Sequence, residues 1–232
     1  GLTWFLSSTI YGWVVRKYWL LVSAVWLGLR LIRKQLTVFR LLVIIVVVYI
    51  ALALTFQIAL GVTLDFARAT VNENREVGAE GSRTVIEAVI ASDNALLQAL
   101  NATITFFRLA FPLELLRFGS VSQLAFISIM PFTFIWMVKV VVEGAKSGNK
   151  NLIQAGKVAL APLSFLIIEG VFEPDFGSFA RPFAMVSPLV LSAMALAQKT
   201  ELAEKRLLRR RQAAAISSNP LFVRPTRQDR IS

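Results

Sequence analysis

Long uncharged stretches alternate with short polar ones along this chain, and the alternation predicts its elements. Residues 41–64 carry no charge over 24 positions. As a helix this stretch would measure about 36 Å, which is enough to cross a ~30 Å hydrocarbon core with some tilt. Residues 118–138 are uncharged over 21 further positions. The pattern therefore predicts an all-α, multi-pass transmembrane protein.

Four spans follow firmly from this pattern. They cover residues 41–64, 118–142, 152–172 and 180–197. The first span is rich in β-branched residues, but it lacks the polar–apolar alternation of a membrane barrel, and in lipid only helices and closed barrels satisfy the backbone. Short loops join the last three spans, so we expect these to be antiparallel neighbours. Pro131, Pro162, Pro182 and Pro188 lie inside them and predict local distortion.

Residues 1–34 form a separate aromatic-rich region in which Arg16 and Lys17 divide two short apolar stretches. One interpretation, which we prefer at this stage, is a helix pair lying in the inner membrane interface. The alternative is a fifth, short span through 18–32, with residues 1–15 on the far side. Tryptophan rings favour the headgroup level, so we predict four interfacial anchors. These are Trp4, Trp13, Trp19 and Trp26.

The polar segment 65–117 connects the first two spans within the central membrane domain, residues 35–197. Apolar residues at three- and four-residue spacing predict a helix within 84–100. Residues 105–118 are apolar but contain three charges and Pro112, which indicates an amphipathic helix lying on the outer surface. Within that helix, Glu114 and Arg117 are spaced to pair.

The charges predict an orientation. Residues 1–40 hold six basic residues and no acid, whereas residues 65–119 hold seven acids and five bases. The tail from Gln198 holds nine bases and three acids. Since Lys and Arg near the ends of spans stay on the cytoplasmic side, or its matrix or stromal equivalent, the basic C-terminal tail 198–232 is predicted to lie inside. Residues 30–40 and 143–151 join it, and 65–117 and 173–180 lie outside.

The amino-acid composition argues against several classes of protein function. The chain has no Cys and no His, so it offers no thiol nucleophile, no Fe–S cluster and none of the usual zinc or haem ligands. No phosphate loop, nucleophile elbow or dinucleotide fingerprint occurs. We therefore expect no catalytic residues, no metal and no cofactor, and we do not expect an enzyme.

Two sets of charged residues are candidate sites. Intramembrane ionisable groups are functional candidates, here for an ion or proton path, although partner-paired structure is the commoner role. The path candidates are Lys157, Glu169, Glu173 and Asp175. A basic cluster after the last span is typical of contact with anionic lipid headgroups, and its lack of interleaved aromatic residues argues against nucleic acid. It consists of Lys205, Arg206, Arg209, Arg210 and Arg211.

These features favour a non-catalytic integral membrane subunit, a structural or assembly component of a larger membrane complex. The end of the tail has no periodicity, so it would be ordered only by a protein partner. The competing hypothesis is a channel or transporter subunit with an ion or proton path near Glu169 and Lys157. The absence of an internal repeat gives the inverted-repeat transporter plan no support.

Overall fold

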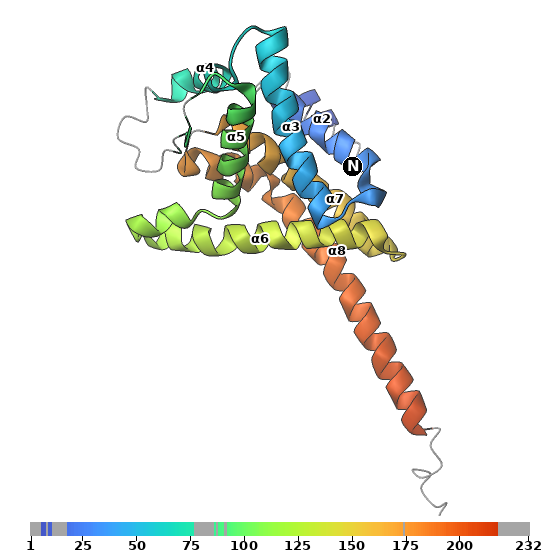
Figure 1. Cartoon of the computed structure of the whole chain (residues 1–232). Helices are drawn as coiled ribbons and strands as arrows, with labels where there is room; N and C mark the ends of the chain where they lie inside the picture. The colour runs from blue at the N-terminus through green and yellow to red at the C-terminus, as the bar shows by residue number, and fades with distance from the viewer. Residues whose placement is uncertain are drawn as a thin grey trace, which may run out of the picture.

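We analysed a computed structural model of the chain, which describes residues 18–217 except 77–85, 87, 91 and 174, together with 6–7 and 9–10. All secondary-structure elements in this part of the chain are helices (Figure 1). In order these are α2 (Trp19–Leu31), η1 (Arg33–Gln35), α3 (Val38–Ala59), α4 (Leu64–Glu76), α5 (Ala95–Ala110), η2 (Leu113–Phe118), α6 (Val121–Lys146), α7 (Lys150–Phe172) and α8 (Phe176–Ser217).

Four helices are long and apolar enough to cross a membrane, which confirms the predicted multi-pass helical fold. They are α3, α6, α7 and the part of α8 from Phe179 to Thr200. Each overlaps one predicted span, with ends that differ by a few residues. For α3 the difference is set by local chemistry: the Thr37 side chain accepts from Arg40 N at the start, and Gly61 turns the chain with φ +65° after the end.

Proline breaks the hydrogen-bond ladder of a helix, and the chain compensates at Pro188. Proline has no N–H to donate to the carbonyl four residues earlier, here that of Ala184. The Ser187 hydroxyl donates to this carbonyl at 2.8 Å, and the Ser192 hydroxyl donates to Pro188 O at 2.7 Å. The backbone of α8 can therefore pass through an apolar region without leaving that acceptor exposed.

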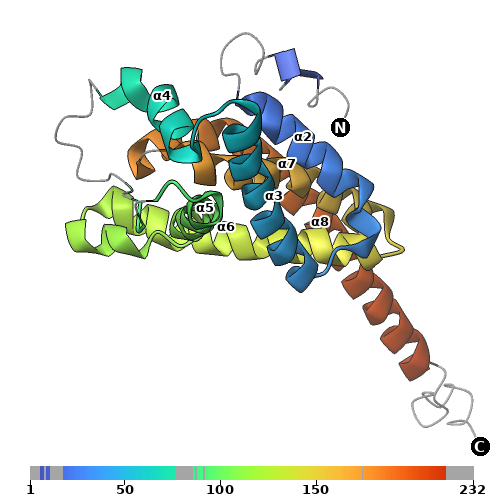
Figure 2. The same cartoon turned by 45° about the horizontal axis from the view of Figure 1, so that its top comes forward.

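Helix α7 is the centre of the molecule. In the most apolar 18-residue stretch of α7, 89% of the residues are buried inside the protein. The corresponding share is 22% for α3, 39% for α6 and 28% for α8. It packs against α6, α8, α2 and α5, and Figure 2 shows it surrounded by these helices. In the other three long helices most residues of the apolar part are at least partly exposed, as in helices that face lipid.

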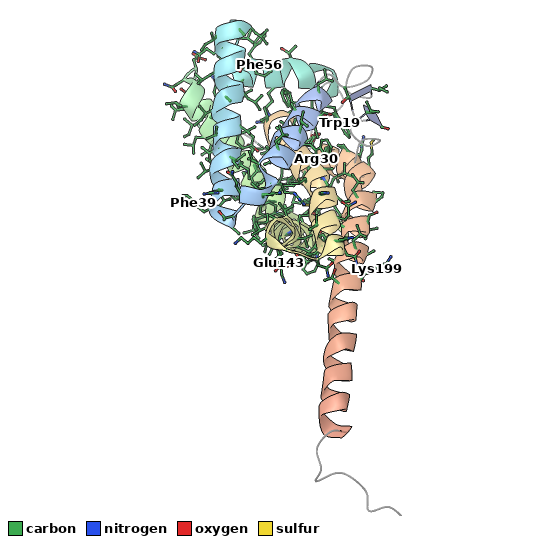
Figure 3. The ribbon with its side chains drawn as sticks, turned by 90° about the vertical axis from the view of Figure 1, so that its right-hand side faces the viewer. Trp19, Arg30, Phe39, Phe56, Glu143 and Lys199 are labelled. Carbon is green, nitrogen blue, oxygen red and sulfur yellow. The ribbon has the colours of Figure 1, made fainter. Side chains whose placement is uncertain are left out.

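The long helices are not parallel. Helices α3 and α5 cross α6 at a steep angle, which is plain because the view of Figure 3 looks along α6 while α3 stays upright. In Figure 1 the α6–α7 turn and η1 lie towards the lower right, where α8 leaves the body, and α4 lies at the opposite corner. The basic and acidic segments of the sequence thus occupy opposite ends of the fold.

Two hydrogen bonds fix the basic end. Arg33 Nη1 donates to Ile153 O at 3.2 Å, so the turn before α3 is tied to the first turns of α7. The Thr200 hydroxyl donates to Asn149 Oδ1 at 3.4 Å, so α8 is tied to the same region. Asn149 also caps α7 by accepting from Asn151 N. This end of the body is therefore held together by side chains from three separate parts of the sequence.

The segment between α4 and α6 differs from the prediction. The helix ends at Ala110 rather than continuing through 105–118, and Leu113–Phe118 is a 3₁₀ helix after Pro112. About half of α5 is buried against α3 and α7 instead of lying flat on a surface. Glu114 pairs with Arg108 through both of its oxygens, a contact that the sequence analysis did not predict. Two of the three charges that argued for a surface helix, Arg108 and Glu114, therefore neutralise each other.

Three helices meet closely at Gly170. A Cβ placed there would lie 2.7 Å from the Tyr49 hydroxyl of α3 and 2.9 Å from Phe106 Cβ of α5. The Tyr49 hydroxyl donates to Ile167 O of α7 at 2.7 Å, and its side chain is fully buried. Only glycine leaves room for this contact, since the neighbours include backbone and a hydrogen-bonded ring.

We predict that Gly170→Ala destabilises the protein by about 1–3 kcal/mol, because an added methyl must displace Tyr49 or Phe106. Gly28→Ala is the matched control, since a Cβ at Gly28 in α2 meets nothing within 4 Å. Thermal unfolding in a mild detergent measures both variants. Equal melting temperatures for the two would contradict the proposed close contact.

Candidate functional site

The acidic residues at the end of α7 form the most unusual polar cluster among the described residues. Glu169 and Glu173 are one helical turn apart, and both are fully buried. Glu173 ends the helix, and its N–H donates to Glu169 O at 3.0 Å. Asp175 follows and is half-buried; its carbonyl accepts from Phe179 N as α8 begins. The cluster therefore lies at the α7–α8 turn, on the face of α7 directed into the protein.

Arg68 of α4 holds the segment around this cluster. Its Nη2 atom donates to Glu173 O at 2.9 Å and to Ile86 O at 3.1 Å. One side chain thus joins α4, the connection before α5, and the end of α7. Both acceptors are main-chain oxygens, so these bonds fix the backbone around the cluster.

Asp65 lies one turn before Arg68, and the charges of this region affect its pKa. Burial raises the pKa of its carboxyl group, the positive charge of Arg68 lowers it, and the negative charge of Asp93 raises it. Burial is the largest of these effects, so the net direction is upward. Burial at the acidic end of the fold therefore disfavours the charged form of the Asp65 carboxyl group.

Buried amides of α5 complete the scaffold of this end. Gln98 accepts from Leu64 N at 2.7 Å and donates to Ser92 O at 2.9 Å. Asn101 accepts from Ile90 N at 3.0 Å and donates back to Ile90 O. Both side chains are almost completely buried. They satisfy backbone groups of the polar connection, which explains why an amphipathic helix can lie inside the protein.

The structure does not bring Lys157 to the acidic cluster. Lys157 is half-buried in the first half of α7, and Glu169 lies twelve residues further along. This spacing corresponds to about 18 Å along a helix axis. Of the four residues proposed for an ion or proton path, Glu169, Glu173 and Asp175 thus lie together and Lys157 lies apart.

The described tryptophans of the N-terminal region pack inside the protein. Trp19 and Trp26 are 6% and 4% exposed. The Trp19 ring meets Phe165 edge-on at 5.5 Å, and Arg30 lies over the Trp26 ring at 5.0 Å. Trp4 and Trp13 lie outside the described residues. The two described rings thus contact α7 or a neighbouring side chain rather than standing on the outer surface.

The predicted basic cluster lies on the last part of α8. The helix continues through Lys205, Arg206 and Arg209–Arg211 as far as Ser217. In Figure 1 this part extends away from all other helices. The irregular tail after Ser217 lies outside the described residues. The position of the cluster is consistent with contact to a surface beyond the body.

An apolar pocket of about 470 Å³ lies beside the acidic end and was not predicted from the sequence. The Tyr18 and Phe172 rings stack there, with 5.1 Å between centroids. The pocket is lined by Tyr18, Leu20, Leu21, Phe56, Val62, Phe66, Ala67, Thr70 and Phe172. Its residues come from α2, α3, α4 and α7 and from the segments next to α2 and between α3 and α4, so no local pattern in the sequence could have indicated it.

Comparisons with models of protein families, with curated proteins and with solved structures gave no match to this chain. Across the part of the chain that the structure describes, no three acidic side chains are grouped to hold a metal ion. Geometry alone therefore indicates what this chain can do.

We predict that Arg68→Met loosens the acidic end, because two carbonyls lose a charged donor, at a cost of about 1–3 kcal/mol. The backbone around Ile86 should be cut faster by a protease that does not select basic residues. Arg181→Met removes an exposed arginine at the start of α8 and serves as the control. Unchanged cleavage in the Arg68 variant would show that these hydrogen bonds do not hold the segment.

Proposed function

We propose that this protein is a structural subunit of a larger membrane complex, and that it presents the end of α8 to a protein partner on the inner side of the membrane. The observation that carries the proposal is the length of α8. It runs for 42 residues, whereas the apolar part ends at Thr200. The remaining 17 residues extend the helix by about 26 Å beyond the body.

An isolated helix of this length gains little stability in water, because nucleation is unfavourable and no tertiary packing supports it. Its sequence includes Leu202, Leu207, Leu208 and Ala213–Ile216 among the basic residues. A helix with apolar and basic residues that leaves its own body is best stabilised by a partner surface. We infer that the partner offers acidic groups beside an apolar strip, since such a surface complements both kinds of side chain.

The body is suited to hold such a helix in a fixed direction. Thr200 is hydrogen-bonded to Asn149 at the point where the apolar part of α8 ends. The neighbouring bond from Arg33 to Ile153 O ties the turn before α3 to the same place. A partner bound to the protruding helix would therefore be positioned relative to all the membrane helices.

The same geometry favours α2 as a fifth, short span. Tyr18, before α2, stacks on Phe172 at one end of α7, and Arg33, after α2, binds Ile153 near the other end. Helix α2 therefore follows α7 along most of its length. We propose that residues 1–17 lie outside, and that the basic end of the fold lies inside.

Single cysteine variants test this topology, because the natural chain contains none. Ser92→Cys marks the outer segment and Ser147→Cys the α6–α7 turn. We predict that a membrane-impermeant thiol reagent labels Ser7→Cys from the same side as Ser92→Cys. Labelling of Ser7→Cys from the side of Ser147→Cys would place the N-terminal region in the inner interface instead.

For the partner itself, we predict that the full-length protein, extracted in a mild detergent, migrates with a stoichiometric protein partner. Replacing Arg209, Arg210 and Arg211 by Gln should weaken this association about tenfold or more, because three interfacial charges are lost. A chain ending at Thr200 should lose the partner while keeping its melting temperature.

The control is Lys150→Gln, which removes an exposed charge at the start of α7 on the same side of the membrane. Full retention of the partner by the chain ending at Thr200 would show that α8 is not the contact. Purification of the intact protein as a lone species would contradict the subunit role.

The alternative is a channel or transporter subunit, and complete burial of Glu169 in α7 and of Glu173 at its C-terminal cap is the observation that favours it. Buried carboxylates in a membrane helix commonly mark ion or proton paths. On this alternative, Glu169→Gln should abolish ion flux in liposomes, while Asp93→Asn, which changes an exposed carboxylate before α5, should leave it unchanged. Flux that survives Glu169→Gln would exclude a path through this carboxylate.

A further inference from the structure

We propose that a groove between α6, α7 and α8 binds a phospholipid whose zwitterionic headgroup carries a primary amine, as phosphatidylethanolamine does. The groove has a volume of about 460 Å³, which is within the usual range for small-molecule sites. It is lined by Phe132, Trp136, Lys139, Val140, Glu143, Leu152, Met194, Ala197, Gln198 and Thr200. This inference does not depend on the protein partner proposed above.

The polarity of the groove changes along its length. Phe132, Trp136 and Met194 line the part farther from the basic end, and Lys139, Glu143 and Gln198 line the part nearer to it. Phe132 and Glu143 are eleven residues apart on α6, which corresponds to about 16 Å. This is the arrangement that a phospholipid requires, because its acyl chain needs apolar walls and its headgroup needs charged ones.

The polar part of the groove lies where a headgroup would be. Glu143 is three residues from the end of α6, and Thr200 marks the end of the apolar part of α8. Figure 3 shows Glu143 and Lys199 at the end of the body from which α8 extends. The Trp136 ring, deeper by two turns than Glu143, suits the boundary between headgroups and acyl chains.

The charges select the headgroup. Lys139 Nζ lies 3.9 Å from Glu143 Oε1, and the two side chains are 66% and 47% exposed. Such an exposed pair contributes little by itself, so each group can exchange its partner for a ligand. A lipid phosphate accepts from Lys139, and a primary ammonium donates to Glu143.

The same pair disfavours other common lipids. A headgroup with a phosphate and no amine brings negative charge towards Glu143 without a cation to match it. A quaternary ammonium is attracted to Glu143 but has no N–H to donate. The pair of opposite charges on one helix face, one turn apart, thus favours the amine-bearing zwitterion over both.

Native mass spectrometry of the delipidated, full-length protein in detergent tests the proposal. The probes are phosphatidylethanolamine, phosphatidylcholine and phosphatidylglycerol with identical acyl chains. We expect phosphatidylethanolamine to bind about tenfold more tightly than the other two. Lys139→Gln should weaken binding of all three lipids, whereas Glu143→Gln should remove the preference for the amine. Lys150→Gln, an exposed lysine outside the groove, should change nothing.

Two further measurements separate the site from general lipid contact. Glycerophosphoethanolamine, which has the headgroup without acyl chains, should not compete at equal concentration. Phosphatidylethanolamine brominated on its acyl chain should quench part of the tryptophan emission, and Trp136→Phe should lose that part. Because Lys139 and Glu143 are exposed, melting temperatures without lipid should match the natural protein and show that the variants fold.

Equal affinity for the three lipids, or affinities that neither variant changes, would overturn the proposal and indicate a non-selective lipid shell. Competition by glycerophosphoethanolamine would overturn the lipid assignment and indicate a site for the soluble headgroup. Preserved emission quenching in Trp136→Phe would place the bound acyl chain elsewhere.

Discussion

The fold depends on one constraint, which is that polar groups inside an apolar region need hydrogen-bond partners from the protein itself. Helix α7 shows how this constraint shapes the whole structure. Its carbonyls at Ile153 and Ile167, and that of its final cap Glu173, accept from Arg33, Tyr49 and Arg68 respectively. These donors come from the turn before α3, from α3 itself and from α4. Since each bond reaches from a separate part of the chain to the central helix, the bonds fix the positions of elements that apolar packing alone would leave free to slide.

The spans could be predicted because hydropathy is a local property. A run such as 41–64 has no alternative in lipid, and it overlaps α3 with only small shifts at the ends. Helix α5 could not be placed in the same way. The charges within 105–118 suggested a surface helix, but the buried amides Gln98 and Asn101 of α5 bind backbone groups of Leu64 and Ile90. The sequence shows that a residue is polar, but it does not show whether the fold will give that residue a buried hydrogen-bond partner.

The candidate site, like the fold, could be predicted only in part. Clustering of Glu169, Glu173 and Asp175 follows from their spacing near one helix end. Arg68 was missed, because its two acceptors are main-chain oxygens and leave no mark in the sequence. The groove was also missed, although Lys139 and Glu143 are one turn apart on α6, because its other wall comes from α8 more than fifty positions later.

The groove itself follows from how α6, α7 and α8 pack. Helices α6 and α8 each make extensive contact with α7 and little contact with each other. A Cβ on Gly144 would lie 2.6 Å from Leu152 O, and one on Gly156 would lie 3.1 Å from Val140 O, so α6 and α7 touch backbone to backbone at the basic end. This contact leaves Val140 and Leu152 as the floor between two separated walls. On our proposal, lipid fills this gap, and the charged pair of Lys139 and Glu143 at its mouth decides which lipid fits best.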